Sequence, residues 1–168
     1  MTAPVSDPRR IAVGIGRIEF SNDRDDVLVA YGLGSCVAVS IFDPATHLAG
    51  LAHVLLPASE GRTPSADEPA RFADTGIEAL IDGMVARGSV AARCLVKAAG
   101  GASVLGQAHG GKFKIGERNA EAIKQQLLRH GLRLSASALG GTHGRTLELH
   151  VASGKTLVRT AASPARDL

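Results

Sequence analysis

Two residues in the first third of the chain have side chains that could carry out nucleophilic chemistry. Cys36 directly follows the glycine-bearing segment 32–35, and His53 is the only ionisable side chain of the apolar run 50–56. Glycines allow a tight turn and leave space above the sulfur, so a substrate could approach it. An imidazole beside a thiol can lower the thiol pKa and take up its proton. Cys36 and His53 are therefore a candidate nucleophile and base.

The turn before Cys36 could also supply N–H groups that stabilise an oxyanion. The candidate donors are the backbone amides of Gly34, Ser35 and Cys36, and losing one such donor typically costs about 3 kcal/mol of transition-state stabilisation. The residue types alone leave a second interpretation open, because a lone Cys or His in an apolar strand is commonly a core residue. Cys94 has no glycine turn before it, which favours core packing and makes it an internal control.

These side chains can meet only if neighbouring strands position them. Apolar, β-branched runs bounded by turn residues predict strands at 11–16, 27–31, 36–42, 50–56, 94–99, 132–138, 146–151 and 155–159. Apolar residues recurring at three and four predict helices over 72–87 and from about 119 to 130. Antiparallel pairing of 36–42 with 50–56 would bring Cys36 and His53 together. The pattern predicts an α+β fold, a layered α/β sandwich of mixed, largely antiparallel strands with two main helices.

Length and composition limit the classes of protein. The 168 residues, 45% of them hydrophobic, suit one core, and we expect a flexible leader at 1–10, one domain at 11–160 and a disordered tail at 161–168. The net charge of +3 is scattered and aromatic residues make up 3%, which disfavours nucleic-acid binding. No signal peptide and no run of about 20 apolar residues is present, so we expect no membrane insertion and a cytoplasmic protein with reduced thiols.

Two long motifs resemble the bacterial chemotaxis family CheD. They are GLGSCVAV at 32–39 and AGLAHVLLP at 49–57. Shorter matches follow in order at 72–75, 97–103, 115–119 and 140–141. The resemblance implies hydrolysis of the side-chain amide of selected glutamines on methyl-accepting chemotaxis receptors, which leaves glutamates. It also implies a fold similar to the catalytic domain of the cytotoxic necrotizing factor toxins.

The same resemblance implies a set of site residues. Cys36 and His53 would be catalytic, acting through a thioester with no metal or organic cofactor. The residues implied to surround the site are Gly100, Gly101, Ser103 and Asn119. The family commonly has a Thr six residues before the cysteine, where this chain has Ala30. A hydroxyl contribution is therefore excluded, and we expect the backbone carbonyl of Ala30 to orient His53.

Two other functions stay open on the sequence. One is a non-catalytic adaptor that binds receptors and the phosphatase CheC, which the resemblance also implies as a partner of the enzyme. The other is a cysteine hydrolase of different specificity, such as a peptidase, a transglutaminase or a small-amide hydrolase, because a fold does not determine the substrate. Slow alkylation of Cys36 would favour the adaptor, and incorporation of an added amine would favour the transglutaminase.

Overall fold

Two five-stranded sheets and two helices form the computed structural model, which describes residues 7–104 and 114–168. The first sheet, which we call the outer sheet, contains in order β1 (Arg9–Ala12), β3 (Asp26–Leu33), β8 (Arg145–His150), β9 (Thr156–Thr160) and β10 (Arg166–Asp167). The second, which we call the central sheet, contains in order β2 (Ile18–Ser21), β5 (Leu48–Val54), β4 (Val37–Asp43), β6 (Leu95–Gly100) and β7 (Ala136–Leu139).

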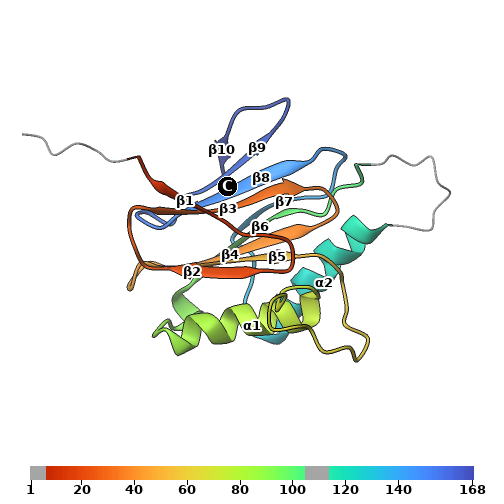
Figure 1. The fold of residues 1–168 in the computed structure, drawn as a ribbon, viewed down its shortest axis with the longest axis horizontal. Helices are drawn as coiled ribbons and strands as arrows, with labels where there is room; N and C mark the ends of the chain where they lie inside the picture. Colours follow the sequence, from red (N-terminus) through yellow and green to blue (C-terminus); the bar gives the residue numbers. More distant parts are fainter. Residues whose placement is uncertain (1–6, 105–113) are drawn as a thin grey trace, which may run out of the picture.

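The helices cover the face of the central sheet that points away from the outer sheet, so the molecule has three layers (Figure 1). These helices are α1 (Ala73–Ala86) and α2 (Ile115–Arg129), and a short 3-10 turn, η1 (Ala91–Arg93), precedes β6. Strand pairing is antiparallel except between β1 and β3 and between β6 and β7. The predicted α+β sandwich with mixed, largely antiparallel strands is confirmed, and similarity to the toxin domain stays a prediction.

Strand β4 explains why the middle layer reads as a continuous apolar run. All of its residues are buried, because alternate side chains enter two different cores. Val37, Val39 and Ile41 pack with the helices, whereas Ala38 and Phe42 pack against the outer sheet. A strand covered on both faces loses the usual alternation of apolar and polar residues. The chain therefore places residue 36 and its neighbours between two packed layers.

Helix α2 begins at Ile115, earlier than the predicted start at Asn119. Gly116 in the first turn of α2 weakens the helical sequence pattern, but it allows the helix to pack closely against the backbone of Gly101 and Ala102. A Cβ on Gly116 would lie 2.5 Å from the Ala102 carbonyl oxygen. Asn119 consequently lies inside the helix on its buried face. Strand β2 was also missed, because four residues paired with β5 leave almost no periodic signal.

Both predicted chain ends differ from the structure. The segment 161–168 was expected to be disordered, yet β10 pairs with β9 and the Leu168 N–H donates to the Thr156 carbonyl at 2.9 Å. Strand β1 begins at Arg9, inside the expected leader. The Arg9 guanidinium donates to the buried carboxylate of Asp26 at 2.7 Å. Backbone pairing of short polar segments has no compositional signature. Residues 1–6 of the expected leader lie outside the described residues.

A buried carboxylate fastens the end of β4 that lies farthest from Cys36. Asp43 is fully buried and accepts two hydrogen bonds of 2.7 Å from the Arg93 guanidinium and one of 2.9 Å from the Ser89 hydroxyl. The Arg93 hydrogen bonds hold the pKa of Asp43 far below its usual range, and they outweigh the opposing effect of burial. This cluster joins the central sheet to the segment between α1 and β6.

We expect Asp43→Ala to lower the free energy of unfolding by about 1 to 3 kcal/mol, because it removes the charged acceptor of the Arg93 guanidinium and of the buried Ser89 hydroxyl. The lowered pKa also has a pH consequence. The carboxylate stabilises the fold above the unfolded-state pKa of about 3.9, and this contribution is lost as the pH falls toward the folded-state value. Urea unfolding should therefore show a shallower acid slope in the variant than in the wild type. Asp82→Ala, at an exposed position, is the control, and equal stability of Asp43→Ala and wild type at pH 7 would contradict this role.

Candidate active site

The candidate nucleophile lies where the chain passes from the outer to the central sheet. Cys36 stands between the end of β3 and the start of β4, after a turn in which Gly32 has a φ of 64°. The Gly34 N–H donates to the Gly32 carbonyl at 2.9 Å and closes this turn. Only 7% of Cys36 is exposed, so its sulfur is recessed. A substrate group would have to be slender to reach it.

The candidate base lies on the neighbouring strand, as the predicted pairing requires. In the antiparallel register of β4 and β5, Ala38 lies opposite His53. Cys36 precedes Ala38 by two residues and packs with it in the core between the sheets, so Cys36 and His53 occupy diagonal positions on one face. Diagonal Cα atoms in such a pair are about 7–8 Å apart, within reach of long side chains. The structure thus brings the two residues to one end of one sheet face.

The loop between β1 and β2 holds His53 in place. The His53 Nδ1 lies 3.0 Å from the Val13 carbonyl oxygen. The His53 backbone N–H donates to the Arg17 carbonyl at 3.0 Å, and the His53 carbonyl accepts from the Gly16 N–H at 2.8 Å. A carbonyl can only accept, so Nδ1 carries the hydrogen and the neutral ring keeps a lone pair on Nε2. Nε2 is buried and has no partner among residues 7–104 and 114–168. The free atom is therefore the one that can accept a proton.

The residue that orients His53 is Val13 and not Ala30. Val13 directly follows β1, and its N–H donates to the Val29 carbonyl at 2.7 Å, which places the Val13 carbonyl beside the ring. Ala30 lies within β3 opposite Leu147 and is fully buried. The glycines that follow this position in the sequence VGIG at 13–16 were the available signal. A contact between residues this far apart cannot be obtained from spacing.

Burial controls the ionisation of both groups. Burial raises the pKa of the Cys36 thiol, and its own backbone N–H opposes this more weakly. Burial lowers the pKa of His53, and the bond to Val13 opposes this more weakly. Both directions favour a neutral thiol and a neutral imidazole, in contrast to the lowered thiol pKa expected from the sequence. Slow alkylation of Cys36 at neutral pH follows from this and does not by itself indicate an adaptor.

Two of the three predicted oxyanion donors bond no other residue that the structure describes. The Gly34 N–H is already bonded to Gly32, which removes Gly34 from the set. In the part of the chain that the structure describes, the N–H groups of Ser35 and Cys36 donate to no other residue. These two amides can therefore receive a developing negative charge beside the sulfur.

The glycine pair at the end of β6 lies directly against the Cys36 backbone. The Gly101 N–H donates to the Cys36 carbonyl at 2.8 Å, and a Cβ on Gly100, where φ is 118°, would lie 2.1 Å from that oxygen. The Arg145 guanidinium donates to the Gly100 carbonyl at 2.9 Å and fixes the pair from the outer sheet. Ser103, by contrast, is exposed, and its N–H donates to the Gly141 carbonyl at 2.9 Å. It is therefore less buried than the predicted surrounding residues Gly100 and Gly101.

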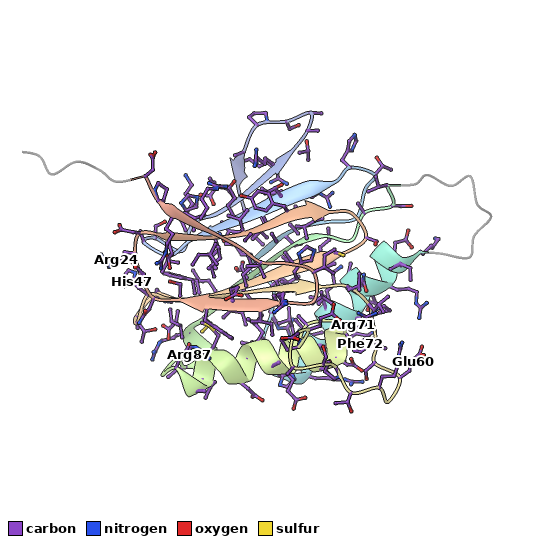
Figure 2. The ribbon with its side chains drawn as sticks, in the orientation of Figure 1. Arg24, His47, Glu60, Arg71, Phe72 and Arg87 are labelled. Carbon is purple, nitrogen blue, oxygen red and sulfur yellow. The ribbon has the colours of Figure 1, made fainter. Side chains whose placement is uncertain are left out.

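The remaining Cys and a second imidazole lie elsewhere. The Cys94 sulfur is 3.1 Å from the Ser89 hydroxyl, beside Asp43. His47 lies in the turn that joins the other ends of β4 and β5, where Figure 2 shows it beside Arg24, 2.6 Å from Nη2 to Nε2. Among the residues with described positions, no three His, Cys, Asp or Glu side chains gather as metal ligands do. No helix within those residues is both long and apolar enough to cross a membrane.

Comparisons with known proteins give consistent names. The family profile described as "CheD chemotactic sensory transduction" matches residues 55–160. The chain is 43% identical over 166 residues to the "Probable chemoreceptor glutamine deamidase CheD" of Symbiobacterium thermophilum, covering 98% of this chain and 100% of that protein. It is 40% identical over 147 residues to the "Chemoreceptor glutamine deamidase CheD" of Thermotoga maritima, covering 88% and 89%.

Among solved structures, the hypothetical protein YfiH of Bacillus licheniformis has a TM-score of 0.48 and 15% identity, covering 81% of this chain and 61% of that one. This likeness is too slight to support an inference. The sequence similarity to the two deamidases, by contrast, extends over most of each chain.

Proposed function

The chain belongs to the CheD family, and from this premise we propose that it is a cysteine-dependent deamidase of glutamines on methyl-accepting chemotaxis receptors, acting in the cytoplasm. The observation that carries the proposal is the shared face of β4 and β5, on which Cys36 lies diagonal to His53. A thiol, a base atom and two N–H groups, the last three without another partner among the described residues, are the parts that amide hydrolysis through a thioester needs.

The first half of the reaction releases ammonia. As the Cys36 sulfur attacks the δ-carbon of a receptor glutamine, His53 Nε2 takes the thiol proton and the carbonyl electrons move to oxygen. The N–H groups of Ser35 and Cys36 stabilise that oxyanion. When the intermediate collapses, the C–N bond breaks and His53 returns the proton to the leaving nitrogen. A thioester and ammonia result.

The second half regenerates the enzyme. Water attacks the thioester carbon while His53 takes one of its protons, and the same N–H groups hold the second oxyanion. The C–S bond then breaks, the sulfur recovers a proton and a glutamate side chain is released. The recessed position of Cys36 favours a long, unbranched side-chain amide over a backbone amide, because only the former can extend into the site.

Treatment of a purified receptor cytoplasmic fragment tests the proposal. Wild-type protein should release ammonia and convert specific glutamines to glutamates, detected together by ammonia assay and by peptide mass spectrometry. A parallel reaction contains an excess of a primary amine. Incorporation of the amine in preference to water would identify a transglutaminase, and receptor binding without any mass change would identify an adaptor. Binding to CheC stays a prediction.

We expect Gly100→Ala to reduce the deamidation rate by more than about tenfold, because displacing reacting groups by 1 Å can cost about a hundredfold. The added Cβ would clash with the Cys36 carbonyl and shift the nucleophile. Gly88→Ala is the matched control. Gly88 also has a positive φ, 92°, but a Cβ there would meet nothing within 4 Å. Equal rates for the two variants, after correction for stability, would show that the close approach at Gly100 is not needed.

A further inference from the structure

Helix α2 carries one polar side chain on its otherwise apolar buried face. Asn119 is fully buried beside Ala120, Ile123 and Leu127. Burying an amide costs free energy unless hydrogen bonds replace those lost to water. Its Nδ2 donates to the Ser35 carbonyl at 2.9 Å and to the Leu55 carbonyl at 3.0 Å. Both donors of this side chain are therefore committed to the backbone of the site.

The first of these bonds controls the direction of a catalytic N–H group. The Ser35 carbonyl and the Cys36 N–H belong to one peptide unit, which is planar and trans, so the two groups point in opposite directions. Asn119 draws the carbonyl toward α2. The Cys36 N–H must then point away from the helix, on the side of its own sulfur, where it is close enough to act on the thiol. It is also one of the two amides that donate to no other residue within 7–104 and 114–168.

The second bond connects the same side chain to the strand of the base. Leu55 directly follows β5, two residues beyond His53. One amide group of α2 thus bridges the segment before the nucleophile and the segment after the base, which flank the consecutive strands β4 and β5. Peptide-plane rotation at 35–36 would break this bridge and place a carbonyl oxygen where a negative charge has to form.

We propose that Asn119 is a positioning residue that sets the orientation of the 35–36 peptide and so builds the oxyanion site of the Cys36 reaction. This inference rests on the proposed function for its substrate, but the oxyanion site itself is required by any acyl transfer to Cys36. Asn119 touches no reacting atom and acts through the backbone.

Two nearly isosteric variants test the proposal. Asn119→Leu removes both donors, and Asn119→Asp in addition turns carboxylate oxygens toward the two carbonyls. We expect kcat for receptor deamidation to fall by about 10² to 10³, the usual effect of losing one oxyanion donor, with KM changed less than about threefold. Alkylation of Cys36 by iodoacetamide forms no oxyanion, so its rate should change less than about threefold. A purely structural defect would change both rates together.

Ser40→Ala is the matched control, because Ser40 is also buried and its hydroxyl also donates to a backbone carbonyl, that of Lys97, at 3.3 Å. It should keep the wild-type kcat. If both Asn119 variants fail to fold, Asn119→Ala, which leaves room for water, takes their place. Wild-type kcat in a folded Asn119 variant would overturn the inference.

Acylation of Cys36 by p-nitrophenyl acetate separates this inference from the proposed function. The sulfur displaces p-nitrophenolate through an oxyanion, with no receptor involved. If the wild type acylates but never deamidates receptors, the proposed substrate is wrong, while a slower acylation of Asn119→Leu still supports the positioning role. Equal acylation by wild type and Asn119→Leu would refute that role whatever the substrate.

Discussion

Cys36→Ser should lose receptor deamidation by more than about 10³-fold, the scale on which removal of a nucleophile acts. His53 is a weak base because burial lowers its pKa, and a serine hydroxyl is far less acidic than a thiol. A base that suffices for the thiol therefore cannot activate the hydroxyl. The substitution exchanges one atom in a buried position, so binding of the receptor fragment should persist.

Cys94→Ser is the control for this prediction, because the Cys94 sulfur contacts the Ser89 hydroxyl at the other end of β4. This variant should deamidate the receptor fragment at the wild-type rate. Peptide mass spectrometry of the receptor fragment gives the rates for both variants. A trapped thioester on Cys36 in rapidly quenched wild-type reactions would add direct evidence. Deamidation by Cys36→Ser at the wild-type rate would remove Cys36 as the nucleophile.

His53→Gln should reduce kcat/KM by about 10² to 10⁴, the contribution of a general acid and base. The Gln side chain has no basic nitrogen, so no general acid or base remains at position 53. The wild-type rate should rise with pH as His53 loses its proton. Because burial lowers its pKa, the midpoint of this rise should lie below the ordinary histidine value of about 6.5.

The pH profile of kcat/KM measures this directly. Wild type should show the acid limb below pH about 6.5, and His53→Gln should lack it. Stability provides a second measurement, because the unfolded chain binds a proton that the buried ring does not. The free energy of unfolding should therefore decrease as the pH falls below that value, and less so in the variant. If the pH profile of His53→Gln kept an acid limb with the same midpoint as the wild type, the titration would belong to a group other than His53.

Much of the fold could be predicted because its central layer is buried on both faces. Strands β4 and β5 leave continuous apolar runs, and their antiparallel pairing is confirmed. The elements that were missed are held by main-chain pairing at sheet edges. Strands β2 and β10 contain four and two residues, too few for any periodicity to show.

The candidate site was predictable in its residue types and less so in its contacts. Cys36 and His53 do lie on one face of neighbouring strands. The acceptor for His53 was assigned to Ala30 and is Val13, and Gly34 was counted as a free donor although Gly32 binds its N–H. Both differences concern backbone groups, whose direction depends on the folded path of the chain. The direction of the Cys36 pKa shift also depends on burial, which spacing does not reveal.

The histidine is oriented by a main-chain oxygen, and every amino acid has one. Exchanging Val13 for another residue of similar volume leaves the acceptor oxygen in place, so position 13 should tolerate many substitutions. A deletion or insertion within 13–17 would instead move the oxygen away from Nδ1 of His53. At this segment, selection would therefore act on the number of residues rather than on their identity, and a loss of function would arise from a change in loop length.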